Sequence, residues 1–339
     1  MLFRRFRRLV ALPAIAATLT LGLAAVAPQF SSPVSAQGDP PSCADPVMSA
    51  PTGPATVSVA SISPFGSVLV VGSGAHAGCS LYVLTSDQLH ALTFGLTPFA
   101  CSDNTNVLGS PCDSVLWPAL LTEGAPIAGP GVKHSLLGTV TRSDVLSGQS
   151  VQQVTYSGLP LYRFVFDDTP GDTEGANLFD PVPSPTGTWY LVDPRGGQPA
   201  PGRAQLQVEP GTDVLGVSMD NGFFDVSANV SFPVYTLSKD SGHDRASKEN
   251  GRQADCQSYC ALIWQPVLTS GPPEAGPGVD QHALGTIVRP NGTQQVTYHG
   301  KPLYLFIKDA YIPGVTGTQG INGAGAVTPW GVFNTIPLS

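Results

Sequence analysis

The chain has 339 residues and a formal net charge of −8; only 12% of its residues are charged, whereas 42% are hydrophobic. An acidic protein repels phosphate groups, so nucleic acid and anionic lipid surfaces are disfavoured as partners. Its 38 glycines and 33 prolines make it rich in turns without reaching the composition of a disordered chain, which favours many short strands.

The first 36 residues have the features of a secretory signal peptide. Four arginines lie within the first eight residues, an apolar run extends from Leu9 to about Ala27, and Val34-Ser-Ala36 offers a cleavage site before Gln37. An uncleaved membrane anchor is the alternative, because the apolar run approaches the length that spans a bilayer. Cleavage would leave 12 basic and 24 acidic residues, a net charge of −12. We predict an exported chain without a membrane span after cleavage.

Two stretches rich in small residues, Pro and Gly interrupt the rest of the chain. Residues 37–65 and 194–212 show little periodicity and are predicted to be linkers. Elsewhere, short alternating or β-branched runs predict strands, and the dipeptides Ser157-Gly158 and His299-Gly300 predict hairpin turns. The fold class is therefore predicted to be all-β, with antiparallel sheets.

Residues 66–193 and 213–339 are predicted to be two copies of one unit, because the same landmarks recur in the same order. The order is a Tyr/Asp motif, a cysteine pair, a tryptophan, Gly-Pro-Gly-Val, the hairpin, a second Tyr/Asp motif and a closing tryptophan. We take Trp189 and Trp330 as the closing tryptophans. Duplicated sequence implies a duplicated fold, because the same pattern of burial must be satisfied twice.

The motif Tyr-x-Phe-x-x-Asp occurs twice in full and twice with Leu in place of Phe. Its residues are Tyr162, Phe164 and Asp167; Tyr304, Phe306 and Asp309; Tyr82, Leu84 and Asp87; and Tyr235, Leu237 and Asp240. Residues two apart on a strand share a face, so we expect the tyrosine and the following aromatic residue to point into the core. The aspartate falls where the strand ends, and we expect it to cap the next turn.

A calcium site is the alternative for the first complete motif. Asp167, Asp168, Asp172 and Glu174 lie within eight residues, and carboxylate oxygens are the ligands that calcium prefers. The spacing matches no EF-hand loop, and the corresponding loop of the second unit has no further acid after Asp309. We therefore interpret the motif as structural and assign no metal.

The run Cys256-Gln-Ser-Tyr-Cys260-Ala-Leu-Ile-Trp264, which follows Tyr235-Thr-Leu-Ser-Lys-Asp240, resembles a bacterial family of secreted repeats. Members often occur as predicted lipoproteins and share Tyr-x-(Phe/Trp/Tyr)-x-x-Asp. This chain departs from the pattern at Leu84 and Leu237, in the wider spacing of Cys101 and Cys112, and in lacking a lipoprotein cysteine. The resemblance implies export and a repeat architecture, and it brings no established activity.

The six cysteines are predicted to form disulfides, because their number is even and the chain carries an export signal. Six cysteines allow 15 pairings. Cys256 and Cys260 would lie about 6 Å apart on one helical turn, within disulfide range. Metal ligation or a redox pair is the alternative there. By position, Cys101 would pair likewise with Cys112, which leaves Cys43 with Cys79.

The sequence offers no support for a catalytic centre or a cofactor. It contains neither a Gly-x-Ser-x-Gly elbow nor a recognisable triad. Residues 239–255 hold four of the 12 mature basic residues; they predict a solvated loop, or a contact loop for an acidic partner. We predict a secreted or cell-surface binding or structural module, with a cell-wall polymer or another surface protein as partner classes. A secreted enzyme, or a metal or electron carrier with a site between the two units, is the alternative.

Overall fold

The computed structural model describes residues 42–45, 48–87, 99–102, 106–107, 110–143, 145–146, 148–180, 187–209, 211–219, 230–240, 254–307, 309 and 323–338. The described residues all belong to one compact unit, Pro40–Ser339. The predicted signal peptide lies outside them. Among the described residues, no helix is long and apolar enough to cross a membrane.

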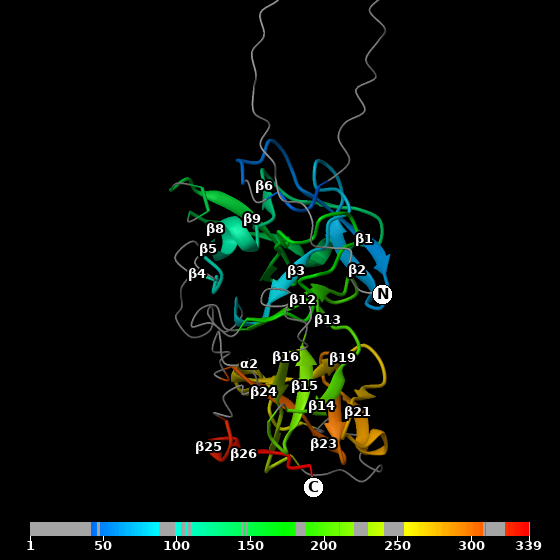
Figure 1. Ribbon diagram of the computed structural model, residues 1–339. Coiled ribbons are helices and arrows are strands. Elements are labelled where there is room, and N and C mark those ends of the chain that lie inside the picture. Colours follow the sequence, from blue (N-terminus) through cyan, green and yellow to red (C-terminus); the bar gives the residue numbers. More distant parts are fainter. Residues whose placement is uncertain are drawn as a thin grey trace, which may run out of the picture. The chain divides into compact units, whose positions relative to one another are not determined.

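The first half of the described chain, strands β1 to β13, forms three sheets and a two-stranded ribbon (Figure 1). The sheet orders are β2-β1-β7, β10-β9-β6 with β8 also on β9, and β11-β12-β13 with β3 also on β12. The strands are β1 (Thr56–Ile62), β2 (Gly66–Val71), β3 (Tyr82–Leu84), β4 (Asn106–Val107), β5 (Ser110–Pro111), β6 (Leu121–Thr122), β7 (Ile127–Ala128), β8 (Leu137–Arg142), β9 (Val151–Tyr156), β10 (Leu159–Pro160), β11 (Phe179–Asp180), β12 (Gly187–Val192) and β13 (Pro199–Ala200).

The second half, strands β14 to β26, forms sheets of order β16-β15-β14-β20, β18-β24-β17-β26-β25, and β19-β22-β21 with β23 also on β22. β14 runs parallel to β20 and antiparallel to β15, as β1 does with β7 and β2. The strands are β14 (Gln205–Val208), β15 (Leu215–Met219), β16 (Val230–Pro233), β17 (Tyr235–Leu237), β18 (Trp264–Pro266), β19 (Leu268–Thr269), β20 (Glu274–Ala275), β21 (Leu284–Val288), β22 (Gln294–Tyr298), β23 (Lys301–Pro302), β24 (Tyr304–Phe306), β25 (Ala326–Thr328) and β26 (Gly331–Thr335).

Helical structure is confined to short turns within the described residues. They are a π-helical turn η1 (Cys112–Leu116), the 3-10 turns η2 (His134–Leu136) and η3 (Gln281–Ala283), and the α-helix α2 (Tyr259–Ile263). Residues 85–87, after β3, are helical as well. The described structure is thus nearly all β, and the predicted fold class is confirmed.

Both predicted hairpins are present, and they have the backbone that their sequences require. Ser157 and Gly158 join β9 to β10 with φ of 52° and 83°, and His299 and Gly300 join β22 to β23 with φ of 47° and 76°. Two successive residues in the left-handed region match the right-handed twist of the flanking strands. A glycine at the second position accepts that conformation without steric cost.

Strands also occur where the composition predicted linkers. β1 lies within 37–65 and β14 within 194–212, and each is hydrogen-bonded on both sides. β1 is a seven-residue strand with Val57 fully buried. The strand contains small Ser and Ala residues, which are also common in linkers. Its extended conformation therefore depends on pairing with β2 and β7.

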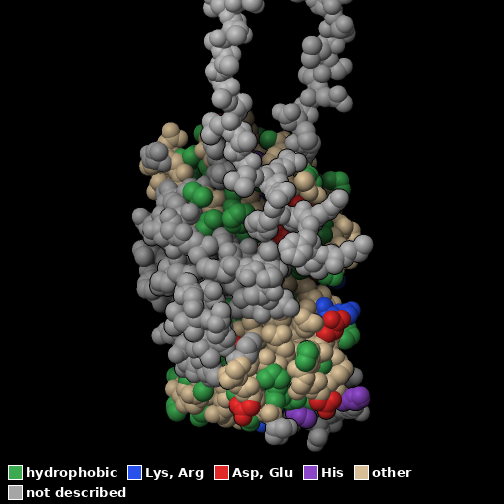
Figure 2. Space-filling view, in the orientation of Figure 1, with side chains coloured by type: hydrophobic (Ala, Val, Ile, Leu, Met, Phe, Trp, Pro, Cys, Tyr) green, Lys and Arg blue, Asp and Glu red, His purple; other side chains and the backbone are tan. Residues whose placement is uncertain are grey.

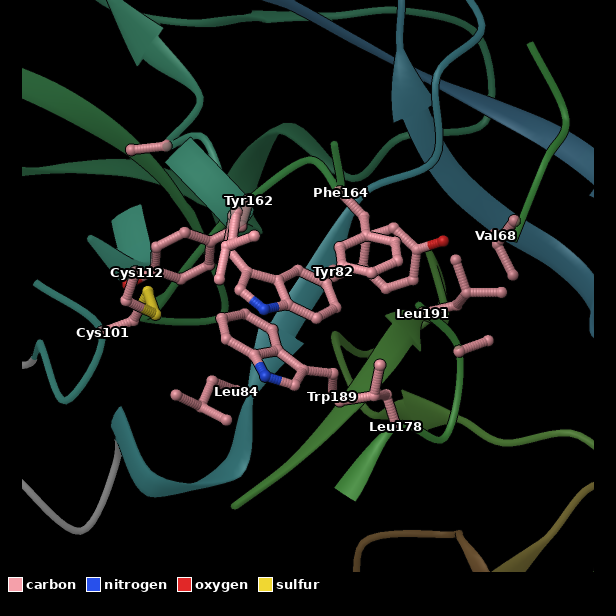
Figure 3. Close-up of a cluster of buried hydrophobic side chains, with 14 of the residues drawn as sticks. Val68, Tyr82, Leu84, Cys101, Cys112, Tyr162, Phe164, Leu178, Trp189 and Leu191 are labelled. Carbon is pink, nitrogen blue, oxygen red and sulfur yellow. A yellow bond between two sulfur atoms is a disulfide. The ribbon is translucent and has the colours of Figure 1, made fainter. Parts of the chain in front are cut away.

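A stack of aromatic rings fills the core of the first half. Trp117 lies between Trp189 and Phe164, with ring centroids 3.7 and 4.2 Å away. Tyr82 and Trp117 meet edge to face with ring centroids 5.4 Å apart, and Tyr162 and Trp189 do so at 5.3 Å. Figure 3 shows Tyr82, Tyr162, Phe164 and Trp189 converging on this cluster. Offset and edge-to-face contacts of this kind add to the free energy gained from burial.

The second half repeats the stack with one change. Trp264 lies between Phe333 and Phe306, again with centroids 3.7 and 4.2 Å away. Phe333 pairs with Leu237 as Trp189 pairs with Leu84. The assignment of Trp330 as the closing tryptophan is therefore wrong. Trp330 lies outside the stack in the turn before β26, and Phe333, three residues later, takes the place of Trp189.

Candidate functional site

The two Tyr/Asp motifs of the first half are hydrogen-bonded to each other in the interior. The hydroxyl of Tyr82 donates to Oδ2 of Asp167 at 2.8 Å, and that of Tyr162 donates to Oδ2 of Asp87 at 3.0 Å. Tyr82 and Tyr162 lie opposite each other as an antiparallel pair, so each tyrosine reaches the aspartate of the other motif. All four side chains are buried.

The second half has the same exchange of partners. Tyr235 donates to Oδ2 of Asp309 at 2.7 Å, and Tyr304 donates to Oδ2 of Asp240 at 2.8 Å. Tyr235 and Tyr304 are also an antiparallel pair, on β17 and β24. The spacing predicted an inward tyrosine and a capping aspartate within each motif. It did not indicate that each tyrosine bonds to the aspartate of the other motif.

The second oxygen of three of these carboxylates accepts a backbone N–H from a loop. Asp87 Oδ1 accepts from Ala100 at 2.9 Å, and Asp167 Oδ1 accepts from Glu174 at 2.9 Å. Asp240 Oδ1 accepts from the N–H of Asp255 at 2.7 Å. Each of these aspartates therefore ties a core tyrosine to a loop that follows it in the sequence.

Burial governs the protonation of these groups. Loss of hydration raises the pKa of Asp87 to about 7 and that of Asp167 to about 8, although hydrogen bonds from the tyrosine and the loop N–H act in the opposite direction. Burial likewise raises the pKa of Asp240. It also raises the pKa of Tyr82 and Tyr162 well above the ordinary value, so both hydroxyls remain donors near neutral pH.

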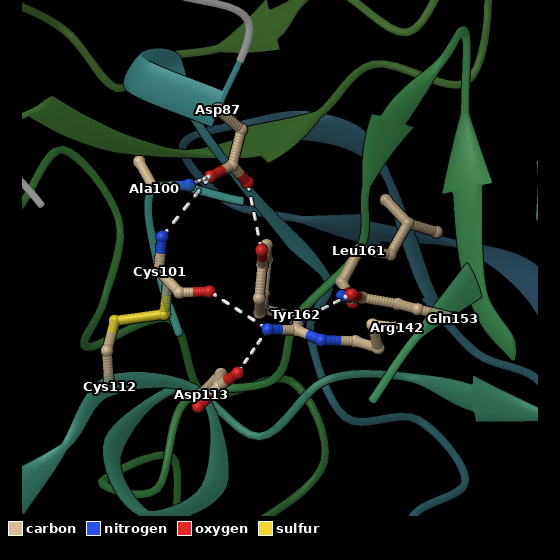
Figure 4. A network of polar contacts seen from close by, with 9 residues as sticks. All are labelled: Asp87, Ala100, Cys101, Cys112, Asp113, Arg142, Gln153, Leu161 and Tyr162. Carbon is tan, nitrogen blue, oxygen red and sulfur yellow. Dashed lines mark hydrogen bonds and ion pairs between the residues drawn. A yellow bond between two sulfur atoms is a disulfide. The ribbon is translucent and has the colours of Figure 1, made fainter. Parts of the chain in front are cut away.

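A buried arginine lies beside the Tyr162–Asp87 pair (Figure 4). Arg142 donates to Oε1 of Gln153 at 2.7 Å and to the carbonyl oxygen of Cys101 at 3.1 Å, and it forms an ion pair with Asp113. Desolvation makes a buried charge costly, and several donors and acceptors in the right geometry offset that cost. The network joins β8 and β9 to the disulfide region.

Arg289 has the corresponding place in the second half. It donates to Oε1 of Gln295 at 2.5 Å, to the carbonyl oxygen of Cys256 at 3.0 Å and to Oε1 of Gln257 at 3.1 Å. Neither arginine is among the residues predicted from the sequence. The available signal was that Arg142 and Arg289 each end a six-residue run that begins Leu-Gly-Thr.

Three disulfides join the six cysteines. They connect Cys43 with Cys79, Cys101 with Cys112, and Cys256 with Cys260, with Cα atoms 5.5, 5.4 and 5.1 Å apart. All six cysteines are buried. The Cys256–Cys260 bridge links the start of α2 to the chain just before it, and so it fixes the helix that precedes Trp264.

The acidic loop after Phe166 is arranged as a capped turn. Asp167 points inward to Tyr82, whereas Oδ2 of Asp172 accepts the N–H and hydroxyl of Thr169 at 2.9 and 3.1 Å. The backbone oxygen of Asp168 accepts the N–H of Cys43 at 3.2 Å. In the described part of the chain, no three His, Cys, Asp or Glu side chains gather closely enough to hold a metal ion.

One buried carboxyl group was not singled out from the sequence. Glu209 is 1% exposed, and its carboxyl group is enclosed in the interior beside the hydroxyl of Ser231. It lies against Ser231 and fills the space that a Cβ at Gly216 would need. Burial raises the pKa of Glu209 to about 7. The first half has Val70, an apolar residue, at the position that corresponds to Gly216.

The visible surface carries few charges. Among the described side chains of this face, Figure 2 shows a few scattered Lys, Arg, Asp and Glu groups, some of them next to a group of opposite charge. Exposed pairs such as Arg203 with Glu274 are local contacts. The basic stretch 239–255 lies mostly outside the described residues, so its predicted role as a contact loop stays a prediction.

The two halves meet through a buried amide. Gln265 accepts the hydroxyl hydrogen of Thr188 at 2.8 Å and donates to the hydroxyl of Thr85 at 2.8 Å. Beside it lies a hollow of about 30 Å³, lined in part by Tyr190 and Leu305. This volume is enough for a water molecule and far below the several hundred Å³ of a typical ligand pocket.

The fold and the buried motif together define an all-β, disulfide-containing protein built on paired Tyr/Asp motifs. Residues 285–326 match the sequence model of a family described as a secreted repeat of unknown function. The match runs from β21 to β25, so it includes the hairpin and the motif from Tyr304 to Asp309. Over these residues the resemblance to a secreted repeat family is confirmed. No curated protein and no solved structure matches the chain significantly.

Proposed function

We propose that the exported chain is a non-catalytic module of the cell surface or the extracellular space, with a binding or structural role. The observation that carries the proposal is the pairing of every motif tyrosine with a motif aspartate in the interior. Groups that bond to each other away from solvent are not available to a substrate. The motif then holds the fold, and any partner is recognised by the surface.

We propose further that the module consists of two units, one over about 66–193 and one over about 213–339. Matched contacts support this: the exchanged Tyr/Asp pairs, the aromatic stacks and the buried arginines occur once in each half. The parallel pairs β1–β7 and β14–β20 also correspond, so each unit would begin one strand earlier than the sequence indicated.

An oxidising location is supported by the three disulfides and by the similarity to a secreted family. Fractionation of cells that express the whole chain, followed by thiol labelling of the protein, tests it. We expect the protein outside the cytoplasm with all six cysteines unreactive. A cytoplasmic protein with reactive thiols would contradict the proposal.

A second measurement on the same material distinguishes the proposed module from the alternative, a metal or electron carrier. Elemental analysis and an absorption spectrum of the purified protein are expected to show no stoichiometric metal and no redox chromophore. A stoichiometric metal, or absorption that changes on reduction, would favour the carrier. Co-sedimentation with purified cell-wall polymer then tests the first partner class directly.

A further inference from the structure

The contact between the two halves provides a template for a second contact. The first half presents Thr85, Thr188 and Tyr190, which we call its trailing face. Thr85 Oγ1 accepts the N–H of Thr188 at 2.9 Å, and both hydroxyls bond to Gln265 of the second half. Thr188 and Tyr190 are only 0% and 4% exposed, because the second half covers them.

The described residues of the second half include the same face, and most of it is exposed. Because Phe333 takes the place of Trp189, the residues corresponding to the three above are Ser238, Val332 and Asn334. The N–H of Val332 donates to Oγ of Ser238 at 2.9 Å, which reproduces the bond between Thr188 and Thr85. Ser238 and Asn334 are exposed. On β25, which pairs with the same strand, the side chain of Val327 is 84% exposed.

The opposite side of each half shows the reverse arrangement. Gln265 and Leu305 of the second half face the first half, and we call them its leading face. The corresponding residues of the first half are Pro118 for Gln265 and Arg163 for Leu305. Both pairs are neighbours across strands: Gln265 pairs with Leu305, and the N–H of Arg163 donates to the carbonyl oxygen of Pro118. Pro118 and Arg163 thus form the leading face of the first half.

A short segment covers that leading face. The guanidinium of Arg163 donates to the backbone oxygens of Cys43 at 3.1 Å and Asp45 at 3.3 Å. The disulfide between Cys43 and Cys79 fixes the segment covalently, and Arg163 is buried beneath it. Residues 42–45 therefore cover the leading face of the first half. In the second half, the corresponding face is covered by the first half.

We propose that residues 42–45 are a cap that prevents copies of this chain from associating head to tail. In such an association, the trailing face of one copy would bind the leading face of the next. Both faces belong to this chain, and the residues that correspond to them are in contact between its two halves. Head-to-tail contacts produce open chains of molecules when the rotation from one copy to the next does not close a ring, and terminal caps keep repeat proteins soluble. The proposal rests on the two-unit organisation proposed above.

The test is to release the cap and follow the size of the protein. A variant with Cys43→Ser, Cys79→Ser and Arg163→Leu exposes the leading face and gives it the leucine that the second half has at this position. Light scattering after size-exclusion chromatography is expected to show one size for the unaltered protein and a ladder of sizes, growing with concentration, for the variant. The single substitution Arg163→Leu, which keeps all disulfides, is expected to shift the average mass upwards at high concentration if the triple variant fails to fold.

Two controls separate specific association from aggregation. Adding Asn334→Arg on the exposed trailing face is expected to restore a single size, whereas Val288→Arg, at an exposed position on β21, is expected to leave the ladder intact. Unaltered protein mixed with the variant is expected to shorten the ladder, because its own leading face is capped. Variants that stay at the unaltered size while retaining the near-ultraviolet circular dichroism of their tryptophans would overturn the proposal. So would a ladder that Asn334→Arg does not suppress.

Discussion

At the scale of single residues, the tyrosine hydroxyls account for the strict use of Tyr in the motif. A phenylalanine would fill the same space in the aromatic stack, but it would leave a buried aspartate without its donor. An unsatisfied buried acceptor costs about 1 to 3 kcal/mol, more than a typical hydrogen bond contributes when both partners are present. Tyrosine and aspartate are therefore required as a pair, although they belong to different motifs.

Replacement of Tyr304 separates the hydroxyl from the ring. We expect Tyr304→Phe to lower the free energy of unfolding by about 1 to 3 kcal/mol, because Oδ2 of Asp240 loses its donor. Tyr304→Ala also removes the ring and should cost about 3 to 5 kcal/mol. Urea denaturation of both variants measures this, with Tyr259→Phe, at a side chain 44% exposed, as the control. A Tyr304→Phe variant as stable as the parent would show that the pairing is dispensable.

The buried carboxyl groups predict how stability depends on pH. Asp87, Asp167 and Glu209 have pKa values of about 7, 8 and 7 in the folded protein, above their ordinary values of 3.8, 3.8 and 4.5. The folded state therefore binds more protons than the unfolded state over this interval, so their contribution is complete in acid and is lost as the pH rises through about 7 to 8. We expect a lower melting temperature at about pH 9 than at about pH 5.

Variants assign this pH dependence to individual groups. Asp167→Asn should flatten the curve of melting temperature against pH, because an amide does not titrate in this range. Asp168→Asn, on the exposed neighbouring residue, is the matched control and should leave the curve unchanged. Stability that rises between about pH 5 and pH 9 would contradict this account.

At the scale of elements, two glycines let a loop pass over the aromatic stack. A Cβ on Gly175 would lie 2.6 Å from Trp117, and one on Gly323 would lie 2.7 Å from Trp264. Both distances are shorter than a van der Waals contact, and both tryptophans are fully enclosed. The loop can approach the ring this closely only where the side chain is absent.

Alanine at this position should therefore displace a ring of the stack. We expect Gly175→Ala to destabilise the protein by about 1 to 3 kcal/mol, as overpacking of a core does. Gly53→Ala is the control, since nothing lies within 4 Å of a Cβ built there. Thermal denaturation and tryptophan fluorescence measure the outcome, and equal effects of the two substitutions would refute the steric argument.

The disulfides should differ in their effect on stability because they close loops of different length. Cys43–Cys79 spans 36 residues and Cys256–Cys260 spans 4. In the chain-entropy description, removing the disulfide that closes the longer loop costs about 4 kcal/mol, and removing the one that closes the shorter loop costs about 2 kcal/mol. Denaturation of the two double-serine variants measures both. A larger loss from Cys256→Ser with Cys260→Ser would show that the short bridge acts by fixing α2 instead.

Local patterns in the sequence predicted some elements and missed others. The hairpins at Gly158 and Gly300 were predictable because their turns require particular residues at particular positions. Strands β1 and β14 were missed because pairing on both sides, and not strong local preference, makes them strands. Phe333 was not predicted to correspond to Trp189, because Trp330, a nearby residue of the same type as Trp189, was matched to it instead. The exchange of Tyr and Asp partners is a contact over 64 to 85 residues, and no local pattern carries that information.

At the scale of the whole molecule, Gln265 couples the two halves. Replacing it with methionine keeps the length of the side chain but leaves the hydroxyls of Thr85 and Thr188 without their partner. We expect Gln265→Met to separate one calorimetric unfolding transition into two, because the coupling between the halves is weakened. Asn291→Ala removes an exposed contact to Gln198 and two bonds from Thr293 in the same turn, and it should leave a single transition. A single, unshifted transition in Gln265→Met would show that the halves do not depend on this amide.

The reciprocal bonding of the motifs has a consequence for the origin of the molecule. Where residue i of one segment contacts residue j of another, and j contacts i, the arrangement is that of a symmetric homodimer. Tyr82 with Asp167 and Tyr162 with Asp87 satisfy this relation, as do the four residues of the second half. Each half thus has the bonding pattern of two single-motif chains joined end to end. An ancestral peptide with one motif would have been complete only in the presence of a second copy, and gene fusion would have made that partnership permanent.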